Sequence, residues 1–159
     1  MYKKLLPAAF ALVALVLAVA CANAPAPEQP ATPVEYLNSG EVLPTGLPFS
    51  EAVRVGDTLY LSGQIGIVPG SLELVPGGLE NEARQTMKNI ETTLAAHGHS
   101  MGDVVKCTVM LADTSEWPAF NDIYASFFEN PYPARSALGA NGLALGARVE
   151  VECIAADGD

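Results

Sequence analysis

Cationic residues are scarce in this sequence: Lys and Arg together number 8, against 18 Asp and Glu, in a chain of 159 residues. The formal net charge is −10. A surface this negative repels phosphate backbones, which argues against general nucleic-acid binding and against a ribonuclease. The sequence also lacks a glycine-rich phosphate loop and a nucleophile elbow. The length suits one domain, with room for a short tail.

Potential metal ligands are scarce as well, since the chain holds 2 His and 3 Cys. His97 and His99 flank Gly98 and find no third ligand at a suitable spacing. We therefore expect no metal site at these residues, and a helix-capping or exposed role for both histidines. Cys107 and Cys153 each fall on the apolar side of an expected strand, where we expect packed free thiols.

Long apolar runs are absent except at the N-terminus. Residues 8–22 are all apolar and follow Lys3 and Lys4, which is typical of a secretory signal peptide. The run is shorter than the roughly 20 residues that a membrane span needs. We predict a signal peptide over residues 1–20. Its removal leaves 6 basic and 18 acidic groups, a charge of −12.

The end of this run, Leu-Ala-Val-Ala-Cys at residues 17–21, resembles the lipobox of bacterial lipoproteins. The resemblance implies that Cys21 carries lipid and holds an exported protein at the periplasmic side of the cell envelope. Two alternatives remain: cleavage after an Ala-x-Ala pattern releases a soluble periplasmic protein, or the segment stays as an uncleaved anchor. Residues 21–33 contain four prolines, which favour an extended tether.

Residues 34–159 predict one α+β domain. Alternating apolar residues around a Gly56-Asp57 turn predict a hairpin, and stripes at helical spacing predict two helices. Residues 65–78 are rich in Gly and Pro and are expected to form a loop. Two helices against one sheet make a sandwich whose other sheet face meets solvent or a partner. The expected elements are strands 52–55 and 58–62, helix 79–97, strand 104–112, helix 116–128, and strands 134–140 and 147–156.

Charged residues on two expected strands are candidates for binding or catalytic roles. Arg135 begins a strand directly after a proline-rich turn. Its planar guanidinium suits a carboxylate bound through two parallel hydrogen bonds, and the alternative is a surface ion pair. Glu150 and Glu152 fall on the polar side of the last strand, where they form either a solvated surface or the lining of a polar site.

Five segments follow one another along the chain: LSGQI at 61–65, EARQTMKNI at 82–90, GDVVK at 102–106, NDIYASFF at 121–128, and PARS at 133–136 followed by Glu150. In this order they resemble the signature motifs of the RidA (YjgF) family, also known as endoribonuclease L-PSP. The resemblance spans about residues 40–156 and implies a chorismate-mutase-like fold, a two-layer sandwich of a mixed sheet with two helices on one face. It also implies a homotrimer with the sheets facing inward and active sites in the clefts between subunits. This fold places the strands of Cys107 and Cys153 side by side, so a disulfide outside the cytoplasm is the alternative to free thiols.

The same resemblance implies hydrolytic deamination of 2-imino or 2-enamino acids to 2-keto acids and ammonia, without metal or cofactor. Arg135 matches the Arg that binds the substrate carboxylate, and Glu150 matches the Glu associated with the attacking water. Ser62 matches a serine of the pocket, and Asn121 matches an Asn that supports the site. The implied partners are therefore a small imino, enamino or keto acid and further copies of this chain.

Two positions depart from the family's archetype. Phe49 stands where the archetype has Tyr, so a hydroxyl is lost while an aromatic wall remains. Ala137 stands where the archetype often has Cys, although its backbone, like that of Gly63, still borders the pocket. These departures leave the substrate range open. The alternative function is a non-catalytic trimeric module that binds small carboxylate ligands.

Overall fold

The computed structural model describes residues 31–158 of the chain. The predicted signal peptide, the predicted lipidation site Cys21 and the tether up to residue 30 lie outside the described residues. From Thr32 onward the chain forms one unit. Neither helix of this part is long and apolar enough to cross a membrane.

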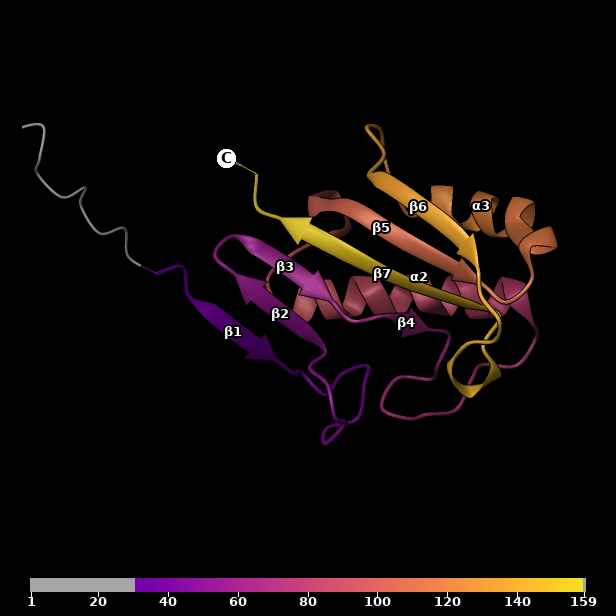
Figure 1. Cartoon of the computed structure of the whole chain (residues 1–159), viewed down its shortest axis with the longest axis horizontal. Coiled ribbons are helices and arrows are strands. Elements are labelled where there is room, and N and C mark those ends of the chain that lie inside the picture. Colours follow the sequence, from indigo (N-terminus) through magenta and orange to yellow (C-terminus); the bar gives the residue numbers. More distant parts are fainter. Residues whose placement is uncertain (1–30, 159) are drawn as a thin grey trace, which may run out of the picture. The chain divides into compact units, whose positions relative to one another are not determined.

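A seven-stranded mixed sheet organises the described residues (Figure 1). Its strand order is β1-β2-β3-β7-β5-β6, and β4 pairs with β7 next to the end of β3. The pairing of β5 with β6 is parallel, and the other pairings are antiparallel. The strands are β1 Val34–Leu37, β2 Ala52–Val55, β3 Thr58–Leu61, β4 Gln64–Ile65, β5 Val104–Leu111, β6 Ala134–Gly139 and β7 Val149–Ala156.

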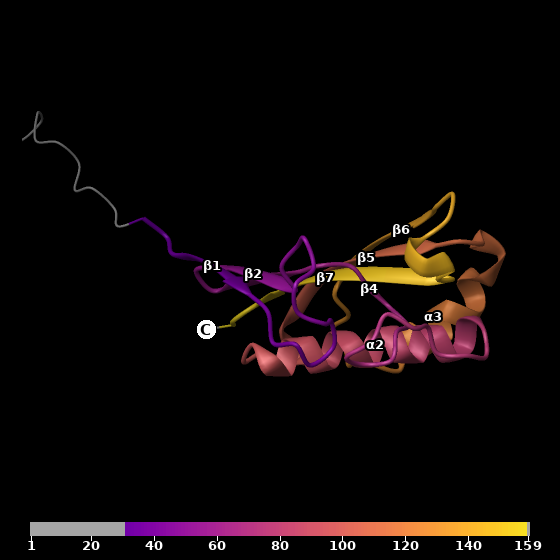
Figure 2. The ribbon, with the colours of Figure 1, turned by 90° about the horizontal axis from the view of Figure 1, so that it is seen from below.

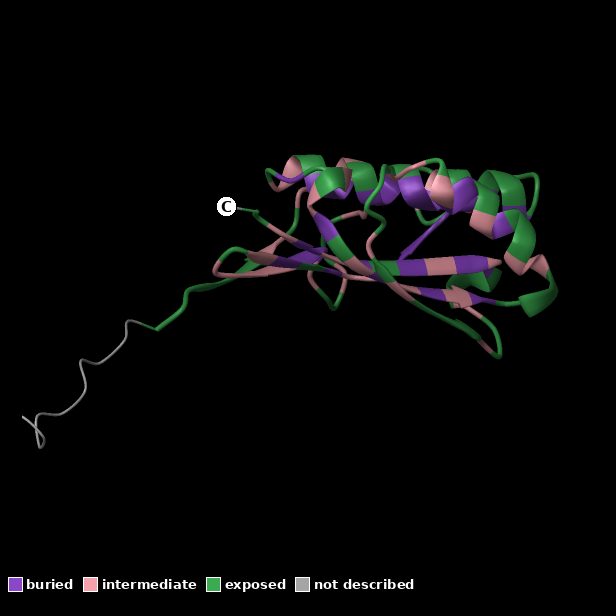
Figure 3. Ribbon diagram, turned by 90° about the horizontal axis from the view of Figure 1, so that it is seen from above, coloured by how far each residue is buried: buried purple, intermediate pink, exposed green. Residues whose placement is uncertain are grey.

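Helices α2 (Leu79–Ala96) and α3 (Trp117–Ala125) cover one face of this sheet (Figure 2). The sides of the helices that face the sheet are buried and the opposite sides are exposed (Figure 3). Burying one apolar stripe per helix against the sheet supplies most of the core. The two-layer α+β sandwich expected from the sequence is thereby confirmed. Fully buried members of the stripes are Ala83, Met87, Ile90 and Leu94 in α2 and Phe120 in α3.

Strand β7 runs through the middle of the sheet and separates its two faces. Val149, Val151 and Cys153 are buried under the helices, whereas Glu150 and Glu152 alternate with them and point to the other face. Cys153 lies directly opposite Cys107 on β5, with the two Cα atoms 4.2 Å apart, and the two residues form a disulfide. The expectation of free thiols is therefore wrong, because antiparallel pairing brings both side chains together on one face.

The other differences from the expected elements each involve only a few residues. Ile65 belongs to β4 and Ile67 bridges to Leu74, so the segment 65–78 is not wholly a loop. A two-residue strand is too short to show a periodic pattern. His97 caps the C-terminus of α2 as expected. His99, in contrast, is buried, with its Nδ1 atom 3.3 Å from an Asp157 carboxylate oxygen.

Candidate active site in two halves

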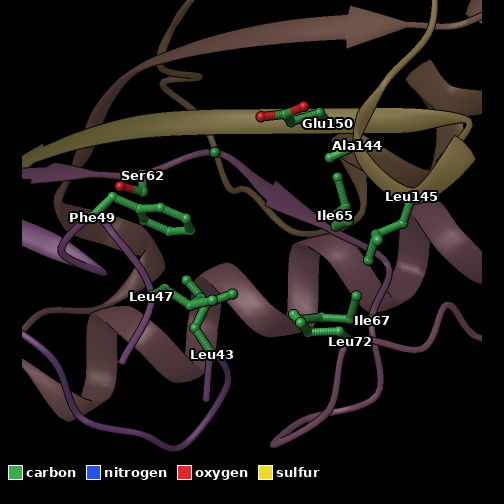
Figure 4. A pocket seen from close by; sticks show the side chains of 11 residues that line it. Leu43, Leu47, Phe49, Ser62, Ile65, Ile67, Leu72, Ala144, Leu145 and Glu150 are labelled. Carbon is green, nitrogen blue, oxygen red and sulfur yellow. The ribbon is translucent and has the colours of Figure 1, made fainter. Parts of the chain in front are cut away.

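A cavity of about 420 Å³, which we call the Glu150 pocket, opens beside β4 and β7 (Figure 4). Four of its lining residues, Phe49, Ser62, Gly63 and Glu150, belong to the predicted site. These four come from three separate parts of the chain and are brought together by the pairing of β4 with β7. The remaining lining residues are apolar: Leu43, Leu47, Ile65, Ile67, Leu72, Ala144 and Leu145.

The Glu150 carboxylate lies directly over the backbone of Gly63. A Cβ atom added at Gly63 would lie 2.1 Å from Glu150 Oε1, so any larger residue there would displace the carboxylate. Burial raises the pKa of Glu150 above its ordinary value, and the negative charge of Glu152 raises that pKa further. A carboxylate with a raised pKa is a stronger proton acceptor than an ordinary surface glutamate.

The Ser62 hydroxyl is already engaged within the chain. Its Oγ donates a hydrogen bond of 2.7 Å to the carbonyl oxygen of Ser50. The oxygen therefore presents lone pairs to the pocket, and the proton is directed elsewhere. Phe49 is about half exposed and forms an aromatic wall beside Ser62 (Figure 4). In this arrangement Ser62 serves as a hydrogen-bond acceptor rather than as an activated nucleophile.

Asn89 of α2 supports this pocket from beneath, although its role was missed in the sequence. Its Nδ2 atom donates hydrogen bonds of 3.0 Å each to the carbonyl oxygens of Ile65 and Ile67. Gln85 donates in turn to Asn89 Oδ1 at 2.8 Å. The side chain of Asn89 is buried. The signal in the sequence was an amide residue on the apolar side of a helix, because a buried amide needs hydrogen-bond partners.

A second cavity of about 350 Å³, the Arg135 pocket, lies between α3 and the start of β6. Arg135 and Asn121, both predicted site residues, line it together. Aromatic and small residues complete the lining: Tyr124, Ala125, Tyr132 and Pro133.

The Arg135 guanidinium is held in place without being neutralised. Its central carbon lies 4.8 Å from the centre of the Trp117 ring and 4.6 Å from that of Tyr124, and its Nη2 donates to Asn121 Oδ1 at 2.9 Å. None of the ion pairs found within residues 31–158 includes Arg135. Stacking on rings orients the planar cation and leaves further N–H donors for an anion. This arrangement favours a carboxylate-binding role over a surface ion pair.

The predicted site residues therefore fall into separate groups. Arg135 pairs with Cys107 in the sheet register and reaches toward α3, on the helix side of the sheet. Glu150 points away from the helices. Ala137 lines a third cavity, of about 310 Å³, together with Trp117 and Leu138. A single chain does not bring Arg135 and Glu150 to one small ligand.

Metal binding finds little support in these groups. Among residues 31–158, no three His, Cys, Asp or Glu side chains are placed to share a metal ion. The chemistry that the described residues offer is an anion-binding cation in one pocket and a proton-accepting carboxylate in the other.

Comparison with known proteins identifies a family and several relatives that this chain resembles. Residues 41–157 match the family model described as endoribonuclease L-PSP. The 2-iminobutanoate/2-iminopropanoate deaminase of Capra hircus is 47% identical over 111 residues, covering 70% of this chain and 81% of that protein. The crystal structure of RidA from an Antarctic Psychrobacter superposes with a TM-score of 0.70 at 36% identity, over 77% of this chain and 98% of the other. Escherichia coli TdcF, solved with bound serine, gives a TM-score of 0.72 at 28% identity, over 78% and 99%.

Proposed function

The chain belongs to the endoribonuclease L-PSP family, also called the RidA or YjgF family, and from this premise we propose that it hydrolyses 2-imino or 2-enamino acids to 2-keto acids and ammonia. The relatives named as imine deaminases support this reaction. The observation that carries it here is the Glu150 carboxylate, which lies in a mostly apolar pocket with its pKa raised.

The reaction needs little catalytic assistance from the protein, because an imine already reacts with water. Arg135 binds the substrate carboxylate through its free N–H donors and fixes the position of the imine carbon. Glu150 accepts a proton from water as the water oxygen bonds to that carbon. The same proton passes to the imine nitrogen and gives a carbinolamine. Glu150 then accepts the proton of the carbinolamine hydroxyl and passes it to the nitrogen, so that the carbonyl forms, the carbon–nitrogen bond breaks, and a keto acid and ammonia are released. For an enamine, protonation at carbon precedes this sequence.

Two copies of the chain are needed for such a site, since Arg135 and Glu150 occupy separate pockets on opposite faces of the sheet. We propose that the Arg135 pocket of one copy meets the Glu150 pocket of a neighbour in a homotrimer with inward-facing sheets. The sheet face opposite the helices carries exposed Tyr36, Tyr60 and Leu138, which supports burial against another copy. Light scattering after size-exclusion chromatography tests the proposal, and a stable monomer that retains activity would contradict it.

An amino-acid oxidase that releases imines in solution provides the test of function. We expect the wild-type protein to accelerate ammonia release from the imine and Arg135→Ala to lose this acceleration. Equal inactivity of both proteins on every imine supplied would refute the deaminase proposal. Mixed trimers of Arg135→Ala and Glu150→Gln test the shared site further. A proportion of mixed interfaces would again combine one intact Arg135 with one intact Glu150, so partial activity is expected to return.

We also propose that the protein is exported and held at the periplasmic side of the cell envelope by lipid on Cys21. The basis is the sequence of residues 1–33, and the Cys107–Cys153 disulfide supports an oxidising compartment. Mass spectrometry of the mature N-terminus in the membrane fraction tests this, with Cys21→Ser as the control. An unmodified N-terminus beginning at Met1 would contradict both export and lipidation.

A further inference from the structure

The polar groups of the Glu150 pocket are confined to one side. Glu150 and Ser62 lie along one wall, while Leu43, Ile67 and Leu72 form the opposite wall (Figure 4). Gly63 contributes backbone only. At about 420 Å³ the cavity is within the size range of small-molecule sites. Most of this space therefore borders on hydrocarbon, beyond the reach of the one carboxylate.

Two leucines extend this apolar surface to the mouth of the pocket. Leu145 is 56% exposed and Leu72 is 49% exposed, although both line the cavity. Leu145 also has a backbone φ of 57°, a left-handed conformation that leucine seldom adopts. Such a conformation at the edge of a site is maintained by its surroundings at a cost in energy. Exposed leucines that line a cavity, with backbone strain beside them, favour a surface that receives an apolar group.

From this surface we propose that the substrate of this protein carries a large apolar side chain, branched aliphatic or aromatic, which occupies the space between Leu72 and Leu145. The inference rests on the proposed imine hydrolysis. With the carboxylate on Arg135 and the reacting carbon beside Glu150, the side chain is the part of the substrate left to enter the apolar space. A charged or strongly polar side chain would lose its hydration there without gaining a hydrogen-bond partner. A very small side chain would leave much of the space unfilled.

Rates on different imines test this preference directly. Imines are generated in solution from leucine, phenylalanine, alanine and glutamate, and kcat/KM is measured for each. We expect the leucine and phenylalanine imines to exceed the alanine imine by about 10- to 100-fold, since each methylene group buried in an apolar pocket favours binding by roughly 4-fold. The glutamate imine is expected to be slowest. Equal kcat/KM for all four would overturn the inference.

Variants then assign the preference to the pocket mouth. Leu145→Asn is informative because Asn tolerates a left-handed backbone, so the change removes apolar surface and keeps the local conformation. We expect Leu145→Asn and Leu72→Asn each to lower the leucine-to-alanine ratio of kcat/KM by about 10-fold. Val68→Asn is the matched control, because Val68 is similarly exposed in the same segment as Leu72 but does not line the pocket. A ratio unchanged in both leucine variants would overturn the assignment.

Binding of keto acids separates this inference from the proposed function. Calorimetry compares 4-methyl-2-oxopentanoate with pyruvate, and no turnover is required. Tighter binding of the larger acid, weakened by Leu145→Asn, supports the inference even if no imine is hydrolysed, in which case the proposed function alone fails. Turnover restricted to the alanine imine, with no preference in binding, refutes the inference and leaves the proposed function in place.

Discussion

The Arg135 pocket and the Glu150 pocket differ in how the chain assembles them. The Arg135 pocket is built within one helix–turn–strand segment, with 14 residues separating Asn121 from Arg135. The Glu150 pocket draws on residues from Leu43 to Glu150 and on a helix beneath it. A locally built pocket keeps its geometry through near neighbours, whereas the other depends on strand pairing across the whole domain.

The two pockets also treat their charged groups differently. Aromatic rings hold the Arg135 guanidinium while leaving it fully charged, because a ring carries no opposing charge. Burial surrounds Glu150 with apolar groups and raises its pKa, which makes the carboxylate more ready to accept a proton. One pocket therefore offers a cation suited to binding an anion, and the other offers a carboxylate suited to accepting a proton. Substitutions in each pocket should accordingly affect different kinetic constants.

Removal of the base should have the largest effect. We expect Glu150→Gln to lower kcat by about 10²- to 10⁴-fold, because the amide does not accept a proton from water. Glu91→Gln is the control for loss of one negative charge, since Glu91 lies on the exposed side of α2 and does not line the pocket. Steady-state kinetics on one imine measure both variants. A kcat for Glu150→Gln close to that of the control would remove Glu150 from the mechanism.

Removal of the cation should have the next largest effect and should act mainly on substrate binding. We expect Arg135→Ala to lower kcat/KM by about 10²- to 10³-fold, corresponding to the loss of two charge-assisted hydrogen bonds. Arg135→Lys should recover only part of this, because a single ammonium does not provide two parallel donors. Arg84→Ala controls for loss of a positive charge, since Arg84 pairs with Glu80 on the exposed side of α2. Full activity in Arg135→Lys would contradict the two-bond arrangement.

Substitution of Asn89, which supports the Glu150 pocket from α2, should have a smaller effect. This effect should appear in the stability of the fold. Asn89→Ala removes the side-chain hydrogen bonds to the carbonyl oxygens of Ile65 and Ile67, and that of Ile65 keeps its bond from the Ile67 N–H. Loss of the two bonds should lower the free energy of unfolding by about 2–3 kcal/mol, which urea denaturation can measure. Gln85→Ala removes only the bond to Asn89 and should cost about 1 kcal/mol. If Asn89→Ala were as stable as Gln85→Ala, the pocket wall would not depend on α2 as inferred.

The difference in assembly also explains what the sequence could predict. Arg135, Asn121 and the stripe of α2 lie within short, regular segments, and their roles as site or core residues follow from local spacing and the family resemblance. The separation of Arg135 from Glu150 and the two-residue β4 depend on which strands pair. No short-range pattern encodes that choice, and the resemblance supplied residue roles without distances.

The smallest predicted effect concerns the pH dependence of the Glu150 pocket. Glu150 acts as a base only when deprotonated, so the rate should rise with pH through its pKa, which burial and Glu152 hold above the ordinary range. Glu152→Gln removes the negative neighbour, so the pKa should fall and the acid limb of kcat should move to lower pH. Burial, the larger cause, is unchanged, so the limb should stay above that of an ordinary glutamate. Glu91→Gln, an equal change of charge on the exposed side of α2, should leave the limb in place. A shift to higher pH in Glu152→Gln would show that another group governs the limb, because loss of a negative charge lowers the pKa of a neighbouring acid.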